Sequence, residues 1–339
     1  MSFKHPTLFR SLSAYRITQA IPLFHDLKAL NEALSVRPEH QPALSALSST
    51  GFRPTLATRQ YEKANLNQDP DSPLDEDDRQ FANAPDGRPS NLIHLELVTW
   101  ERQVPSWEVR RRLAQKVEKI ELNEQRKIYK KERDQLKDDV VQEILATALV
   151  KPTFLQALIL PSDHLILVDT PSAKKAEMLL SMLREALGSL PVRQLKVRLE
   201  PSVSMTEWLR DKRAPYGFSL LDGVIMEDDH SGKVGMVHQD ITDDVVDEHL
   251  SHGLMATKLA IAYGNMSFLL EQSTSASAFL IRKIHHADLV ADQFYANNGD
   301  SCDPITEHNG LHLLQADSLR SMLTDLVEAL GGEDEPKQI

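Results

Sequence analysis

The spacing of apolar residues along the chain predicts a set of short strands. Residues 8–18 and 91–100 each alternate well enough to form one strand. Two apolar runs within residues 153–170 flank a Pro-Ser-Asp sequence, which is typical of a strand, a turn and a second strand. Residues 266–271 and 278–284 predict a hairpin, so the strands come in neighbouring pairs.

Helices lie between these strands in no regular order. Residues 172–187 have the apolar spacing of an amphipathic helix and end at Gly188, a usual C-cap residue. Residues 317–330 predict a final helix that ends at Gly331-Gly332. Because no regular strand–helix–strand alternation is present, we expect an α+β fold, with mixed antiparallel sheets and long helices, rather than a doubly wound sheet.

Composition divides the chain into four regions. We expect an N-terminal α+β region over residues 1–100, a basic helical region over 101–150, and a central α+β region over 151–310. Residues 311–339 are expected to form a C-terminal strand and helix with an acidic tail. Within the first region, residues 65–90 are rich in Asp, Pro, Asn and Gly, which predicts a flexible acidic loop because such a segment buries little apolar surface.

The overall composition is that of an ordinary globular protein, with 41% hydrophobic and 26% charged residues in 339. Residues 1–16 lack the pattern of a signal peptide, and no apolar run is long enough for a membrane helix, so we expect a cytoplasmic protein. The single cysteine, Cys302, excludes an internal disulfide and a multi-cysteine zinc site.

The net charge of −12 argues against nucleic-acid binding, but the charges are unevenly distributed. Residues 69–78 hold six acidic residues and no basic one, whereas residues 101–137 hold twelve Lys or Arg against seven Asp or Glu. A protein with its charges separated in this way can bind DNA on one face.

A stripe of cations is the feature of the sequence that most directly indicates chemistry. No Gly or Pro interrupts residues 106–151, which predicts a helical stretch; a break near Lys131 would divide it into two helices, and the sequence leaves both forms open. Steps of three and four residues place one set of positions on a single helix face: Arg112, Lys116, Lys119, Asn123, Arg126, Lys130, Arg133 and Lys137. Such a face can neutralise phosphates without reading bases. The alternative is a solvated helix face, on which Glu118, Glu121 and Glu124 pair with the cations.

Other patterns indicate little chemistry. Glu227, Asp228, Asp229 and His230 lie together, but they match no known ligand spacing and are more typical of a solvated loop. The chain has no phosphate-binding glycine loop and no nucleophile elbow. We therefore expect no enzyme activity, no cofactor and no metal; a metal-dependent nuclease using the cluster from Asp228 to His230 is a minor alternative.

The order of several short motifs resembles the family of recombination-associated protein RdgC. The matching segments are Phe9-Arg10-Ser11-Leu12, Tyr15-Arg16, residues 127–141, Ser172–Glu177, Leu187–Val192, Thr206-Glu207-Trp208, Gly217-Phe218, Leu220-Leu221-Asp222, Gln239-Asp240, Thr257–Ala260 and Leu330-Gly331-Gly332-Glu333. They cover nearly the whole chain.

The resemblance implies a ring-shaped homodimer, closed by two different contacts, whose positively lined hole encircles double-stranded DNA. It further implies binding without sequence preference, binding of single-stranded DNA, a nucleoid-associated location and antagonism of a RecA-type recombinase. A ring also reconciles DNA binding with an acidic chain, because the acidic residues can lie on its outside. The alternative partner is a recombination protein, bound directly, with incidental contact to DNA.

This sequence departs from the family at three places. A Lys-Gln pair that binds DNA in the family corresponds here to His238-Gln239, and His238 is a weaker, pH-dependent cation. A family aromatic residue at a ring contact falls near Leu149, so that contact is not transferred. The acidic loop over residues 65–90 is longer than usual. Lys174 and Lys175, at a predicted helix N-terminus, are further phosphate-binding candidates, with solvated surface residues as the alternative.

Overall fold

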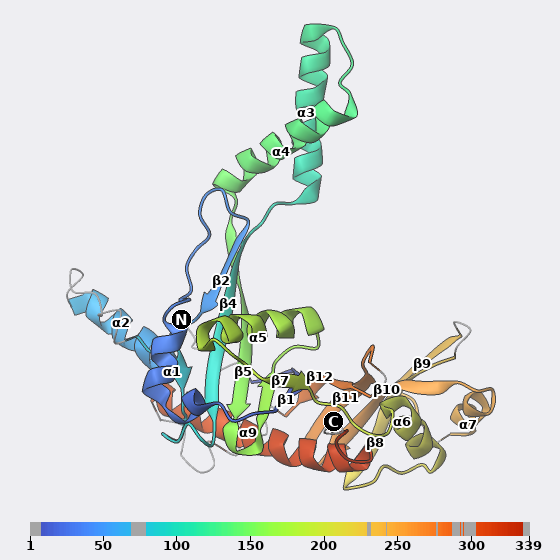
Figure 1. Ribbon diagram of the computed structural model, residues 1–339. Coiled ribbons are helices and arrows are strands. Elements are labelled where there is room, and N and C mark those ends of the chain that lie inside the picture. The colour runs from blue at the N-terminus through green and yellow to red at the C-terminus, as the bar shows by residue number, and fades with distance from the viewer. Residues whose placement is uncertain are drawn as a thin grey trace.

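The computed structural model describes residues 8–68, 79–228, 232–241, 243–275, 277–286, 292, 294 and 303–334, without the side chains of residues 65–68. Twelve described strands form one antiparallel sheet in the order β2-β4-β5-β6-β1-β12-β11-β10-β8-β9, with β3 paired to β4 and β7 paired to β1 (Figure 1). The strands are β1 (Ser11–Ile17), β2 (Ser48–Phe52), β3 (Ala82–Asn83), β4 (Ile93–Arg102), β5 (Val150–Leu160), β6 (Leu165–Val168), β7 (Val192–Gln194), β8 (Phe218–Glu227), β9 (Lys233–Val237), β10 (Met255–Tyr263), β11 (Met266–Gln272) and β12 (Phe279–His285).

Helices cover both faces of this sheet, and the expected α+β class is confirmed. The α-helices are α1 (Leu27–Leu34), α2 (Leu56–Gln68), α3 (Ser106–Glu124), α4 (Lys130–Thr147), α5 (Ala173–Leu187), α6 (Pro201–Arg210), α7 (Asp244–Ser251) and α9 (Pro304–Ala329). The predicted hairpin is β11–β12, and the predicted strand–turn–strand unit is β5 and β6 joined by a short 3-10 helix. Within the described residues, no helix has the length and apolar character needed to cross a bilayer.

The second half of β5, residues 155–160, and all of β6 are buried on both faces, which explains their nearly continuous apolar sequences. Leu158 and Leu167 point into a core shared with α9, whereas Ile159 and Ile166 point into a second core shared with α1 and α5. Because side chains alternate along a strand, one apolar run serves both cores. Each buried Leu or Ile stabilises the fold by roughly 1.5–3 kcal/mol.

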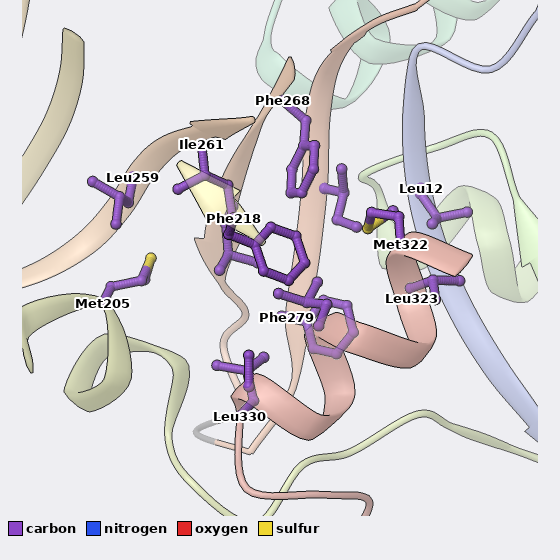
Figure 2. Packing of buried hydrophobic residues seen from close by; sticks show 14 of the residues in the cluster. Leu12, Met205, Phe218, Leu259, Ile261, Phe268, Phe279, Met322, Leu323 and Leu330 are labelled. Carbon is purple, nitrogen blue, oxygen red and sulfur yellow. The ribbon is translucent and has the colours of Figure 1, made fainter. Parts of the chain in front are cut away.

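The first described strand, β1, joins the two halves of the sheet. It pairs with β6 on one side, and on the other side with β12 through Ser11 and Leu12 and with β7 through residues 15–17. Leu12 of β1 lies in the core that also contains Met322 and Leu323 of α9, and Phe218 and Phe279 complete the apolar cluster (Figure 2). The N-terminal strand is therefore a central element of the sheet.

The C-terminal region differs from the expected strand and helix over residues 311–339. Residues 304–329 form one helix, α9, because the Asp303 side chain caps the amides of Ile305 and Thr306 and apolar residues continue at helical spacing to Leu326. The predicted end of the helix at Gly331-Gly332 is confirmed, since both glycines have positive φ angles. The expectation of a strand before the helix was wrong.

Two of the motifs that carry the family resemblance meet at this C-terminus. Glu333, directly after the two glycines, accepts hydrogen bonds from the guanidinium groups of Arg16 on β1, at 2.5 Å, and Arg193 on β7, at 2.6 Å. The side chain of Glu333 is mostly buried. The Gly-Gly-Glu sequence thus ties the end of α9 to the middle of the sheet.

The structure describes part of the expected loop over residues 65–90. Residues 65–68 are the end of α2, and Phe81 and Ala82 are buried, with their amides donating to the Asn31 side chain. The expectation of a flexible loop was therefore wrong for these residues. Residues 69–78 lie outside the described part of the chain.

A buried histidine links β12 to α9. Gln315 accepts a hydrogen bond from the amide of Phe9 and lies 3.1 Å from His286 Nε2, to which its amide group donates. Burial lowers the pKa of His286 to about 4, so the ring is neutral at pH 7.

This depressed pKa predicts loss of stability in acid. The neutral ring stabilises the fold fully above its ordinary pKa of 6.5, and that contribution falls as the pH approaches 4. Between pH 6.5 and pH 4, we expect the free energy of unfolding to decline by on the order of 3 kcal/mol less in His286→Gln than in the wild-type protein. Urea unfolding across this pH range measures the difference. Exposed His25→Gln is the matched control. An unchanged decline in His286→Gln would refute the assignment.

Candidate nucleic-acid interface

The most prominent feature outside the compact part of the chain is a helical arm. The strands β4 and β5 pair from Ile93–Ile159 out to Arg102–Val150; β6 ends early on one side of this ladder, and β2 follows it to Glu101 on the other (Figure 1). The ladder ends in α3 and α4, which we call the arm together with their connection, residues 106–147. The ladder fixes both ends of the arm, since one strand enters it and the next leaves it.

Arg102 is a buried cation at the base of the arm. Its guanidinium donates hydrogen bonds to the carbonyl oxygens of Pro42, at 3.0 Å, and Leu145, at 3.2 Å, with longer contacts to those of Ala43 and Ala148. The group therefore joins the end of α4 to the segment before β2. Arg102 has a structural role and is not available to a phosphate.

The structure resolves the open question of one helix or two. The α3 helix ends at Glu124, Gln125 has a left-handed backbone with φ 49°, and α4 begins at Lys130. The second helix returns along the first, with Lys116 paired to Glu143 at 2.6 Å and a small core that includes Val140. The predicted stripe is consequently split between two helices and does not form one face.

Several members of the stripe are already paired with acidic residues. Arg112 donates to Glu108 at 2.7 Å, as does Arg111, and these hydrogen bonds lower the pKa of Glu108 to about 2. Arg126 is held between Glu124 and Glu132, whose hydrogen bonds raise its pKa. Lys116 is also paired. Arg112, Lys116 and Arg126 therefore match the alternative interpretation of the stripe, a solvated helix face whose cations pair with acidic residues.

The remaining cations of the stripe are exposed and unpaired. None of Lys119, Lys130, Arg133 and Lys137 forms an ion pair with a described residue. Across residues 106–147 there are eleven Lys or Arg and nine Asp or Glu, so the arm is only slightly positive as a whole. Any attraction for phosphate must come from where the unpaired cations gather.

They gather at the tip of the arm, where the sequence pattern missed two of them. Lys127 and Lys131 are exposed and form no ion pair with the described residues, but they lie off the three-four spacing. Local density would have found them, since residues 126–133 contain five cations and one acid. Cations at the N-terminus of α4 oppose the helix dipole, so helix stability does not account for them. We call Lys127, Lys130, Lys131 and Arg133 the tip cations.

The other candidate residues lie far from the arm in sequence and on other elements. Lys174 and Lys175 are exposed in the first turn of α5. His238 and Gln239 follow β9 and are also exposed; His238 Nδ1 lies 2.9 Å from Asp222 Oδ2, so a carboxylate already faces the imidazole. A single chain does not bring the three groups together.

The minor metal-site alternative at residues 227–230 is only partly within the described chain. Glu227 pairs with Lys233 at 2.7 Å, and the Asp228 carboxylate accepts a hydrogen bond from the Gly232 amide. Asp229 and His230 lie outside the described residues. The described part is a capped turn.

Exposed apolar side chains lie at both ends of the molecule. Leu122 and Tyr129, at the tip of the arm, are 76% and 79% exposed. Val237 and Val245, near β9 and α7, are exposed at the opposite end of the sheet (Figure 1). Leu149 is also exposed, but at the base of the arm, where α4 joins β5.

The fold and this surface define an α+β protein built on one antiparallel sheet with a projecting helical arm whose tip is basic. Comparison with known sequences identifies the family. The family model described as "Putative exonuclease, RdgC" matches residues 81–333. The chain is 36% identical to recombination-associated protein RdgC of Pseudomonas paraeruginosa, 35% to that of Pseudomonas aeruginosa (strain LESB58), and 34% to that of Pseudomonas syringae pv. syringae. Each alignment covers 98% of this chain and 99% of the relative. The chain belongs to the RdgC family.

The position of Arg102 predicts that the orientation of the arm depends on this side chain. Arg102→Leu removes the guanidinium donor from the buried carbonyl oxygens of Pro42 and Leu145, and we expect a loss of about 2–4 kcal/mol in the free energy of unfolding. Hydrogen exchange should also speed up at the end of α4. Arg110→Leu is the control, because Arg110 is exposed and donates only to the Ser106 carbonyl. Equal effects of both substitutions would contradict the anchoring role.

Proposed function

We propose that this protein binds DNA without sequence preference, as a homodimer that encircles the duplex, and that it thereby restrains a RecA-type recombinase. The observation that carries the proposal is the group of exposed, unpaired tip cations on a projecting arm. The names of the relatives support a role in recombination. In this proposal the protein is nucleoid-associated and also binds single strands.

The binding mechanism rests on phosphate neutralisation. Unpaired Lys and Arg side chains displace the counterions condensed on DNA, and this release drives binding whatever the base sequence. The tip cations, Lys119 and Lys137 suit this task because they form no ion pair with the described residues. Arg112, Lys116 and Arg126 are expected to contribute less, because a phosphate would first have to displace their acidic partners.

Closure of a ring would explain how an acidic chain holds DNA. The arm and the β8–β9 end of the sheet project from the molecule in different directions (Figure 1). The exposed Leu122 and Tyr129 at one end, and Val237 and Val245 at the other, suit two different contacts with a second copy of the chain. One twofold axis relates both contacts, so two copies would enclose a passage. Lys174, Lys175, His238 and Gln239 would join the tip cations around it.

We propose that the protein acts without catalysis. Its relatives carry the name of a recombination-associated protein, whereas the family description names an exonuclease. In the cluster considered for a nuclease, Asp228 to His230, the described carboxylate of Asp228 accepts a hydrogen bond from the Gly232 amide. Encirclement needs binding and closure only.

A second candidate function is direct binding of a recombination protein. The near balance of charge over the arm, together with exposed Leu122 and Tyr129 at its tip, also fits a protein partner. Affinity for the recombinase in the absence of DNA distinguishes this function, because the encircling ring needs DNA as the shared partner.

The charge argument predicts a selective change in salt dependence. Replacing Lys127, Lys130 and Lys131 by Gln should weaken duplex binding and lower the slope of log K against log salt by roughly 0.9 for each phosphate that is no longer neutralised. Fluorescence anisotropy on several duplexes across a salt series measures both. The matched control is Arg111, Arg112 and Lys116 replaced by Gln on the same arm, with a smaller expected effect.

Equal losses of affinity in the two triple variants, or binding that salt does not affect, would sink the charge argument. The duplex should keep its length during these measurements when Mg²⁺ or Mn²⁺ is present. Shortening of linear duplex would instead favour the exonuclease named in the family description.

The ring predicts topological trapping. Once bound at low salt, the protein should stay on closed circular DNA after a salt increase and leave when the circle is cut. We expect Leu122→Asp with Tyr129→Asp to abolish trapping and weaken the dimer in sedimentation, because two charges would be placed in an apolar contact. Leu149→Asp, at the base of the arm, is the control. Equal release from circular and linear DNA would count against encirclement.

A further inference from the structure

Three histidines meet in the interior, far from the basic arm. His94 lies on β4, and His308 and His312 lie one turn apart on α9. One nitrogen from each ring can be chosen such that all three lie within 4.8 Å of one another. His94 and His312 are buried, and His308 is half-buried. The cluster joins two parts of the chain that are more than 200 residues apart.

Hydrogen bonds to the described residues leave several of the ring nitrogens unsatisfied. His94 Nε2 and both ring nitrogens of His312 are buried without a hydrogen-bond partner among the described residues. A buried polar group without a partner costs roughly 1–3 kcal/mol, so three such atoms in one place call for an explanation. A metal ion would use these lone pairs directly.

The surroundings supply further features of a metal site. The Gln156 side chain on β5 hydrogen bonds to the His94 ring, and His94 Nε2 has no hydrogen-bond partner among the described residues, so it is available as a ligand. Metal-bound histidine usually has a second hydrogen bond through its other ring nitrogen. A cavity of about 10 Å³ lies beside His94 and His308, enough for about one water molecule as a fourth ligand.

We propose that His94, His308 and His312 bind one divalent transition-metal ion of the Zn²⁺ type, with a structural role. Three imidazoles and one water are a familiar ligand set for Zn²⁺. The ring planes of His94 and His312 are stacked at 4.1 Å, so their lone pairs do not yet converge. Binding would rotate the rings and shorten the nitrogen–nitrogen distances to about 3.3 Å, as tetrahedral Zn²⁺ with ligands at about 2.0–2.1 Å requires. The ion would then tie α9 to β4, next to the hydrogen bond between Asn83 and Asn309.

Metal titration of the full-length protein, after treatment with a chelator, tests the proposal. Co²⁺ should give the visible absorption of a four-coordinate site with three nitrogen ligands and one oxygen ligand, and it should saturate at one ion per chain. Zn²⁺ should displace Co²⁺ and raise Tm by roughly 5 °C at 100 times its Kd. His308→Ala and His312→Ala should each weaken Co²⁺ binding by more than about 100-fold. Loss of a group that only supports a ligand costs up to about 100-fold, and loss of the ligand itself should cost more. Exposed His25→Ala should bind normally.

Two controls keep the outcome decisive. Circular dichroism of the metal-free variants separates lost binding from lost folding. If a variant does not fold, X-ray absorption of the Zn²⁺-loaded wild-type protein decides, with three histidine nitrogens expected at about 2.0–2.1 Å. Absence of a one-to-one Co²⁺ site in the wild-type protein, unchanged binding in folded histidine variants, or a spectrum without histidine ligands would each overturn the proposal.

Discussion

The structure depends on burial of its central strands from both sides. Because β5 and β6 contribute alternate side chains to two cores, neither strand can shift its register by one residue without turning both apolar sets towards the wrong neighbours. The pairing of β4 with β5 is locked in the same way, and it continues outward as the stalk of the arm. The sheet therefore fixes the position of the arm, the pair of solvated helices that projects from it.

The charge of the molecule follows from the same arrangement. Cations near the sheet are used in the fold: Arg16 and Arg193 bind Glu333, and Arg102 binds backbone carbonyls. Cations on the inner part of the arm are neutralised by Glu108 and Glu143. The cations that remain free to bind a polyanion lie mostly at the tip of the arm. A net charge of −12 is then compatible with DNA binding, since the affinity depends on a few unpaired groups and not on the sum.

The sequence predicted those helices and strands whose apolar spacing and end residues agree with how they are buried in the fold. The helix over residues 172–187 has both an amphipathic face and Gly188 with a positive φ angle, and it was found with its correct end. The paired strands β5–β6 and β11–β12 were found because each pair is nearly contiguous. In contrast, β2 and α2 have weak apolar patterns, and they are held by pairing and packing with distant segments.

The candidate site was less accessible to sequence reasoning. Periodicity alone placed Arg112 to Lys137 on one face, but a five-residue connection that begins at left-handed Gln125 reverses the chain. Ion pairing across that reversal, as between Lys116 and Glu143, depends on tertiary structure. The spacing of His308 and His312 was visible in the sequence, yet its meaning depends on His94, which only the packing of α9 against β4 brings near.

The most direct test of the account is a structure of the protein bound to a short duplex, determined by cryo-electron microscopy. The account predicts two chains closed around the DNA, with contacts at the arm tips and at the opposite ends of the sheets, and with the tip cations facing phosphates along the inner wall. A single chain lying against one side of the duplex, or DNA held away from the arm, would contradict it.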